Sequence, residues 1–302
     1  MRFGILSPVV FRPPGQFSAW ETDAGPAELV QVAEAADRLG YHHLTCSEHV
    51  GVPARIAARA GGTYWDPLAT LGFLAAHTTR IRLATHVLVL GYHHPLEIAK
   101  RYGTLDRLSG GRVVLGLGVG SLKEEFALLG ADFDGRGAAA DDAIRALRAA
   151  WGQPLPEYEG THYRFRDFLI DPHAPRRRVP LWIGGYTRRS LRRAVELGDA
   201  WVPFGLPPEQ LTTMLAAVER PEGFDVILTP PPLDPIADPG GARRHVEQLQ
   251  AAGATMMNIV LRHRSAEHCV EQLAAFRQLF DQASWPAADQ PAGVAEARHA
   301  GA

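Results

Sequence analysis

The sequence predicts a (β/α)8 TIM barrel, and three observations lead to this fold class. Short apolar runs rich in β-branched residues alternate with stretches of helical periodicity, which is typical of repeated βα units and a parallel sheet. Eight such units can be followed along the chain. The chain has 302 residues, 46% of them hydrophobic, and barrels of ~250 residues usually form one domain.

The expected elements follow one another along most of the chain. Strands are expected at residues 3–7, 44–47, 81–90, 113–117, 181–183, 200–202, 225–228 and 256–261. Helices are expected at residues 26–39, 67–76, 95–108, 122–129, 138–151, 188–197, 207–218, 239–252 and 265–280. Pro26 and Gly40 mark the beginning and end of the first helix, and residues 50–65 are expected to form a loop.

Residues 152–180 interrupt the alternation. Tyr158 and the run 163–165 flank a Gly160–Thr161 turn, which predicts an inserted hairpin. An open, doubly wound sheet is the alternative fold, but eight right-handed units close naturally into a barrel.

We expect a single barrel domain over residues 1–281. Residues 282–302 are rich in Ala, Pro and polar residues without a period, so we expect a disordered tail there.

Composition and charge exclude several classes of protein. The formal net charge is −2, from 31 basic and 33 acidic residues, which gives no basic surface for nucleic acid or an anionic membrane. The amino-terminal residues lack the layout of a signal peptide, and no apolar run reaches the ~20 residues of a membrane span. Cys46 and Cys269 lie far apart, without the spacing of metal ligands. We therefore expect a cytoplasmic protein without a metal site.

In a barrel of this kind, functional residues collect where the strands end. Glu48 and His49 follow the second strand, where a histidine can deliver or accept a proton and the carboxylate can orient the imidazole or meet a cofactor. An ordinary surface pair is the alternative interpretation. His86 lies inside the apolar third strand, where it is either a hydrogen-bonded core residue or a ligand-binding residue.

Two glycine-containing segments are candidates for contact with an anionic or planar ligand. Gly118 and Val119 belong to the run 116–120 after the fourth strand, where a tight turn is an equal explanation and Ser121 breaks the dinucleotide fingerprint. Gly184 and Gly185 precede a helix that begins near Arg188, and this combination favours a phosphate site.

Three other clusters receive structural interpretations. Glu124–Glu125 suits the first turn of a helix, Arg176–Arg178 is read as a solvated loop, and His93–His94 lacks the spacing of a metal pair.

At these motifs the sequence resembles the luciferase-like monooxygenase superfamily, specifically its F420-dependent oxidoreductase branch. The resemblance covers roughly residues 1–280. It is carried by residues 47–50, 88–95, 104–112, 116–120, 125–130 and 180–185.

The resemblance implies a cofactor against the third strand, with a non-proline cis peptide at His86–Val87. It also implies that Glu48 and His49 line the site beside the reacting ring, and that Gly184, Gly185 and Arg188 hold the cofactor phosphate. Gly118 and Val119 would complete the cofactor site. Family members are commonly dimers, so a homodimer with a small-molecule substrate is the expectation that follows.

The resemblance favours coenzyme F420 over FMN. Flavin-using luciferases carry an arginine where this chain has Val119, and many F420-type relatives have tryptophan at Ser121 and proline at Gly91. We expect hydride transfer between F420 and a small organic substrate. The alternatives are an FMN-dependent monooxygenase, a non-catalytic binding subunit and, more distantly, a nicotinamide dehydrogenase.

Overall fold

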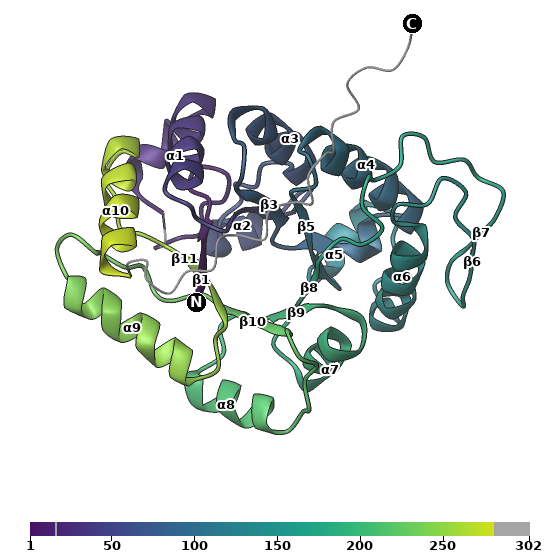
Figure 1. The fold of residues 1–302 in the computed structure, drawn as a ribbon. Helices are drawn as coiled ribbons and strands as arrows, with labels where there is room; N and C mark the ends of the chain where they lie inside the picture. The colour runs from purple at the N-terminus through teal and green to yellow at the C-terminus, as the bar shows by residue number, and fades with distance from the viewer. Residues whose placement is uncertain (16, 281–302) are drawn as a thin grey trace, which may run out of the picture.

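Residues 1–15 and 17–280 are described by a computed structural model, and they form the predicted barrel (Figure 1). The barrel has eight parallel strand positions, which we call staves. The third stave consists of two short strands. The staves are β1 (Arg2–Leu6), β2 (His43–Cys46), β3 (Arg82–Thr85) with β4 (Leu88–Val89), β5 (Val113–Gly118), β8 (Leu181–Gly184), β9 (Ala200–Val202), β10 (Asp225–Leu228) and β11 (Met256–Ile259).

The barrel closes because its first and last strands pair. Arg2 of β1 lies opposite Met256 of β11, and β1 pairs with β2 on its other side. The sheet continues through β3, β5, β8, β9 and β10 back to β11. Closure leaves no free sheet edge, which confirms the barrel over the open sheet.

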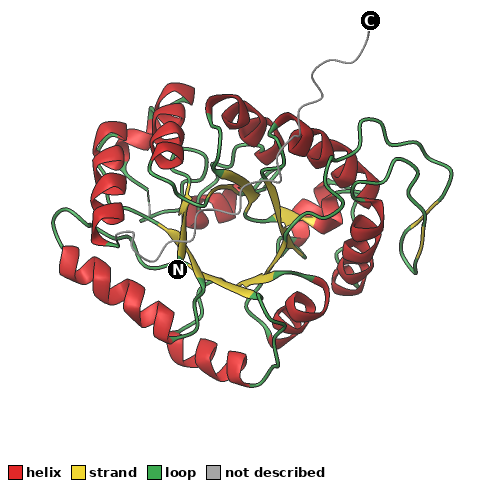
Figure 2. Cartoon of the chain, in the orientation of Figure 1, coloured by secondary structure: helices red, strands yellow, loops and turns green. Residues whose placement is uncertain are grey.

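Most of the helices surround the strands as an outer ring, whereas α2 (Ala54–Ala60) lies behind the barrel in this view (Figure 2). The other helices are α1 (Pro26–Arg38), α3 (Pro67–His77), α4 (Pro95–Leu108), α5 (Lys123–Leu128), α6 (Arg136–Ala150), α7 (Arg188–Leu197), α8 (Pro208–Ala216), α9 (Pro239–Ala251) and α10 (Ala266–Leu279), with short 3-10 turns η1 (Ala19–Thr22) and η2 (Leu90–Tyr92). No helix of residues 1–15 and 17–280 is long and apolar enough to cross a membrane.

The interior of the barrel is filled by side chains. Those of one cluster are apolar: Ala84, Val114, Trp182, Ala200, Val202, Ile227 and Met256. A polar chain lies beside them, in which His42 contacts His43 and His43 hydrogen-bonds the Asn258 amide oxygen. The His43 ring occupies the space next to Gly4, where any side chain would collide with it. The barrel is therefore a packed core at this level, and a ligand must bind above it.

The structure corrects three local expectations. The strand expected at residues 81–90 is interrupted, because β3 ends at Thr85 and β4 begins at Leu88. The loop expected at residues 50–65 contains α2. Arg176 is not simply solvated, since its guanidinium pairs with the fully buried Asp106.

The inserted segment has the predicted hairpin. Strands β6 (Tyr158–Glu159) and β7 (Arg164–Phe165) pair antiparallel, with Tyr158 opposite Phe165. Asp142 of α6 fixes the hairpin turn, since its carboxylate accepts hydrogen bonds from the Tyr158 hydroxyl and from the backbone N–H groups of His162 and Tyr163. The tail expected at residues 282–302 lies outside the described residues.

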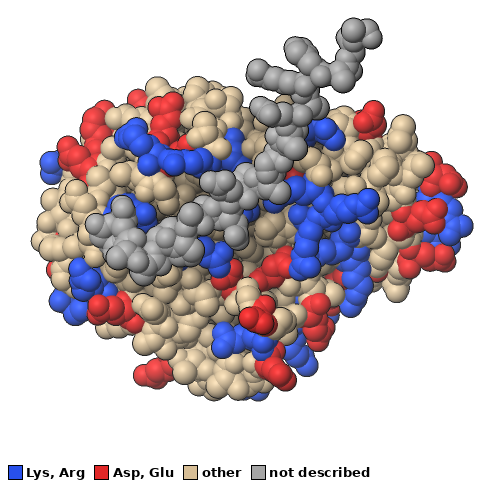
Figure 3. All heavy atoms as spheres, in the orientation of Figure 1, with Lys and Arg blue, Asp and Glu red and all other residues tan. Residues whose placement is uncertain are grey.

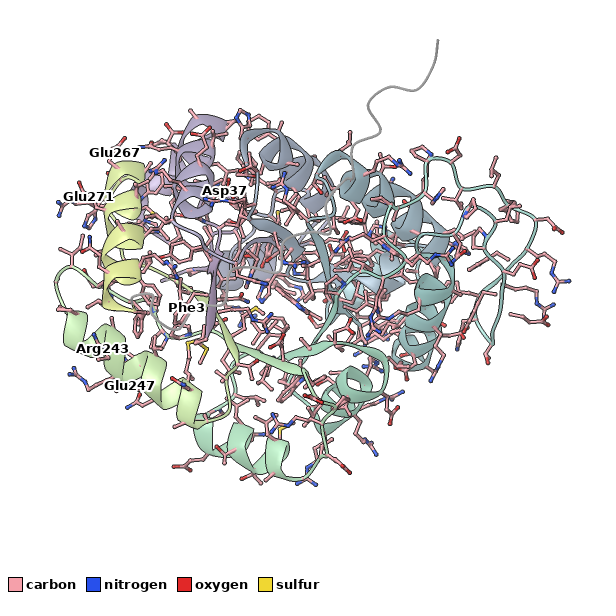
Figure 4. All side chains as sticks on the ribbon, viewed as in Figure 1. Phe3, Asp37, Arg243, Glu247, Glu267 and Glu271 are labelled. Atoms are coloured by element: carbon pink, nitrogen blue, oxygen red, sulfur yellow. The ribbon has the colours of Figure 1, made fainter. Side chains whose placement is uncertain are left out.

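Asp37, near the end of α1, connects this helix to the segment that enters β3 (Figure 4). Its carboxylate accepts hydrogen bonds from the backbone N–H groups of Thr79, Arg80 and Ile81, at 2.8, 2.9 and 2.6 Å, and from the Thr79 hydroxyl. Burial alone would raise the pKa of Asp37, but these donors outweigh burial and lower it. The ionised form is therefore the one that stabilises the fold.

We expect Asp37→Ala to reduce the free energy of unfolding by about 1–3 kcal/mol at neutral pH, because three backbone donors lose their acceptor. Urea denaturation measures the change. Glu34→Ala, an exposed carboxylate on the same helix, is the control and should have little effect.

The contribution of Asp37 should also depend on pH in a defined direction. Its folded pKa is lowered, so the stabilisation is complete above the unfolded pKa of about 3.9 and is lost as pH falls through the folded pKa. The difference between the wild type and Asp37→Ala should therefore shrink in acid. A difference that grows below pH 4 would contradict this assignment.

Candidate functional site

A buried carboxylate, Glu125 of α5, organises the loops at the mouth of the barrel. Its Oε2 lies 2.6 Å from His49 Nδ1 and accepts the Tyr92 hydroxyl at 2.7 Å. Its Oε1 accepts the backbone N–H groups of Val50 and Gly51, at 2.6 and 3.2 Å. These donors come from the segments that follow β2 and β4, and α5 itself follows β5. One side chain thus joins three loops that are distant in sequence.

The hydrogen bonds decide the protonation state of Glu125. Its side chain is 0% exposed. Burial alone would raise its pKa, but the hydrogen bonds from Tyr92 and His49 outweigh burial and lower the pKa. The same carboxylate and the burial of the ring raise the pKa of Tyr92, so the phenol stays a hydrogen-bond donor. The sequence interpretation of Glu125 as a residue that only favours the helix dipole missed this role.

His49 is held at Nδ1 and free at Nε2. Its ring packs against Tyr64, with centroids 4.4 Å apart, and its side chain is 22% exposed. Within residues 1–15 and 17–280, no hydrogen bond to Nε2 is formed. This is the arrangement of a base or acid whose ring is oriented by a carboxylate on one side and open to a substrate on the other.

Glu48 does not orient His49, so that part of the sequence prediction is wrong. Its carboxylate instead accepts the backbone N–H of Val89 at 2.6 Å and lies 2.7 Å from His93 Nε2. Burial opposes the charged form of His93, but the contact with Glu48 raises the pKa of this imidazole. Glu48 therefore fixes the segment that contains β4 and η2, and both of its oxygens are occupied.

His86 and Val87 occupy the break in the third stave, and the peptide bond between them is cis. Ser47, which directly precedes Glu48 and His49, donates a hydrogen bond of 2.8 Å to the His86 carbonyl. This hydrogen bond connects the cis peptide to the segment that follows β2. The His86 ring packs edge-on against Phe204, and burial lowers the pKa of His86 to about 4. His86 Nε2 is buried without a hydrogen-bond partner among the described residues. A neutral core histidine that lacks a partner is unusual, and it fits a residue that meets a ligand.

Val87 packs against Gly118 of the adjacent β5 and Gly184 of β8, the strand beyond it. A Cβ on Gly118 would lie 2.6 Å from Val87 Cγ2, and a Cβ on Gly184 would lie 3.0 Å from Val87 Cγ1 and from the Phe204 ring. The sequence predicted contact of these glycines with a ligand, with a tight turn as an equal explanation for Gly118. Their immediate physical role is to make room for Val87, and this contact places Gly118 and Gly184 beside the break.

Gly185 and Arg188 lie at the beginning of α7. Gly185 has φ +128°, a conformation that other residues rarely adopt, and Thr187 caps the helix by accepting the Ser190 N–H. The backbone N–H groups of Arg188 and Arg189 have no partner within the described part of the chain, and both side chains are exposed. The segment thus has the free amides and the cation that a phosphate group needs.

Val119 is partly buried in the loop after β5. Arg136 reaches this loop and donates to the Gly120 carbonyl at 3.0 Å, but its guanidinium also bonds the Phe133 carbonyl and lies over the Phe133 ring. The Arg136 guanidinium is therefore engaged within the protein. It does not replace the positive charge that an arginine at position 119 would supply.

Hydrogen bonds and side-chain contacts thus connect the segments that carry Glu48, His49, His86, Val87, Gly118 and Gly184 at one end of the barrel. In residues 1–15 and 17–280, no group of three or more His, Cys, Asp or Glu side chains could hold a metal ion.

Comparisons with known proteins show the family of the chain. Residues 1–233 match the family model described as Luciferase-like monooxygenase. An F420-dependent glucose-6-phosphate dehydrogenase from Microbacterium testaceum is 30% identical over 204 residues, which are 66% of this chain and 59% of that protein. A 4-hydroxyprotoasukamycin monooxygenase from Streptomyces nodosus subsp. asukaensis is 33% identical over 185 residues, which are 59% of this chain and 47% of that protein.

The fold of a solved structure is also similar. The crystal structure of monooxygenase RslO1 from Streptomyces bottropensis has a TM-score of 0.70 with this chain, at 24% sequence identity. The match covers 92% of this chain and 98% of the other.

We expect Glu125→Gln to lower the free energy of unfolding by about 1–3 kcal/mol, because the amide offers one acceptor oxygen where four donors converge. Urea denaturation tests this. Glu124→Gln is the matched control, since the neighbouring side chain is exposed and contacts only Arg55, and it should change stability little. Equal effects of the two substitutions would contradict the role given to Glu125.

Proposed function

Because the chain belongs to the luciferase-like monooxygenase family, an oxidoreductase family, we propose that it transfers a hydride between coenzyme F420 and a small organic substrate. The observation that carries this proposal is the His49–Glu125 pair, which leaves one imidazole nitrogen open at the mouth. The relative from Microbacterium testaceum, named as F420-dependent, supports the choice of cofactor.

The residues at the mouth fit a planar ring with polar edges. His86 Nε2 is a buried nitrogen without a partner among the described residues, and the half-exposed Phe204 ring lies next to it. His86 and Val87 would hold the ring, with Gly118 and Val119 at its side. Gly184, Gly185 and Arg188 would hold the phosphate, since free amides at a helix start and a guanidinium both bind anions.

In this mechanism, bound F420 supplies the hydride chemistry, and the protein supplies orientation and a proton. His49 gives or takes the proton through Nε2, while Glu125 keeps the ring oriented. Glu48 holds the β4 segment in place through Val89 and His93, and so acts as a positioning residue.

An FMN-dependent monooxygenase is the second candidate function. It is favoured by the 33% identity to the monooxygenase from Streptomyces nodosus. Val119 argues against this candidate, because the flavin-using luciferases that the sequence resembles have an arginine at this position. Arg136, which reaches the same loop, already donates hydrogen bonds to the Gly120 and Phe133 carbonyls.

Titration of the purified protein with F420 and, separately, with FMN distinguishes the two candidates, with the fluorescence of each ring as the signal. We expect saturable binding of F420 and much weaker binding of FMN. Tight binding of FMN without binding of F420 would replace the first candidate by the second.

We expect His49→Ala to slow turnover by ~10²–10⁴-fold while the affinity for the cofactor is retained, because only the proton transfer is lost. Steady-state kinetics and the same titration measure the two quantities. His77→Ala, which removes a half-exposed histidine at the end of α3, is the control and should keep wild-type turnover. Unchanged turnover in His49→Ala would remove the role assigned to this residue.

A further inference from the structure

A basic hollow of about 520 Å³ lies between α6, the end of α7 and the segment that enters β8. Four of its lining residues are arginines: Arg145, Arg148, Arg177 and Arg178. Figure 3 shows basic side chains gathered over the segment between α6 and β8.

Two of the four arginines are held by one carboxylate. Asp199 accepts Arg148 at 2.6 Å, pairs with Arg178, and accepts the backbone N–H of Leu181 at 2.8 Å. Burial alone would raise the pKa of Asp199, but these donors lower it, so the carboxylate stays charged. Asp199 therefore balances only part of the charge of the arginines that it touches.

The other two arginines have no such partner. Arg145 and Arg177 are exposed, and neither forms a hydrogen bond or ion pair with another described residue. The only carboxylate that lines the hollow is Glu196, within the part of the chain that the structure describes. Four guanidinium groups thus face two carboxylates, Glu196 and Asp199, which leaves an excess of positive charge that a multivalent anion would balance.

The hollow is at the opposite end of the barrel from the mouth. Arg177 and Arg178 precede the beginning of β8 at Leu181, and Leu197 and Gly198 precede the beginning of β9 at Ala200. Segments that enter strands lie at the amino-terminal face of a barrel, whereas His49 and His86 follow strand ends. A ligand of the hollow is therefore separate from the cofactor and the substrate.

We propose that this hollow binds a phosphoanhydride chain, as found in nucleoside di- and triphosphates. Guanidinium groups bind phosphate oxygens in bidentate pairs, and the excess of positive charge favours a ligand that carries several negative charges in a row. The partly buried Leu197 adds an apolar surface against which the uncharged part of the ligand can pack. This inference does not depend on the function proposed for the mouth.

Isothermal titration calorimetry of the full chain with inorganic tripolyphosphate, at about 0.15 M salt, tests the proposal. The double variant Arg145→Gln/Arg177→Gln should bind at least tenfold more weakly than the wild type. It should remain folded, because neither side chain has a partner to lose among the described residues. The control Arg220→Gln/Arg244→Gln removes the same charge from exposed positions elsewhere and should bind as the wild type does.

Citrate is the second ligand of the experiment, since it carries carboxylates in place of phosphates. We expect citrate to bind at least tenfold more weakly than tripolyphosphate. Equal affinity for both would overturn the assignment to phosphate, because the hollow would then respond to charge alone. The absence of saturable tripolyphosphate binding, or an equal loss in both double variants, would overturn the site itself.

Discussion

A carboxylate that is removed from water must be matched by hydrogen-bond donors, and at the mouth of this barrel that requirement falls on Glu125. Its donors come from His49, Val50, Gly51 and Tyr92, which belong to two different loops. Satisfying one buried group therefore fixes the loops after β2 and β4 relative to α5. The orientation of His49, and with it the open Nε2, follows from this constraint.

A second constraint is steric. Side chains in a folded interior are packed to the density of organic crystals, so the Val87 side chain needs space on the neighbouring strands. Gly118 and Gly184 provide that space by lacking a Cβ. Because Val87 is accommodated there, the third stave can break between β3 and β4 without losing contact with the strand next to it, since both parts still pair with β5.

The barrel could be predicted because parallel strands are buried on both faces and are read as continuous apolar runs separated by helical patterns. The site was predictable only in part. His49 and Glu125 are 76 residues apart, and no periodicity relates them. The same holds for Arg176 and Asp106, which are 70 residues apart. For α2 a signal was present, because the run Ala54–Ala60 consists mainly of good helix formers, but its place in a loop of small residues concealed it.

Charged side chains are stabilised differently at the two ends of the barrel. At the mouth, Glu125 is matched by surrounding donors out of contact with water, whereas at the other face Arg148 and Arg178 share the partly buried Asp199. The four residues of β8 separate these ends by roughly 13 Å, and salt screens exposed charges beyond about 8 Å. The field of an anion bound in the hollow would therefore act on the mouth only weakly. Asp199 instead acts locally, since it accepts the backbone N–H of Leu181 at the start of the strand that ends at Gly184.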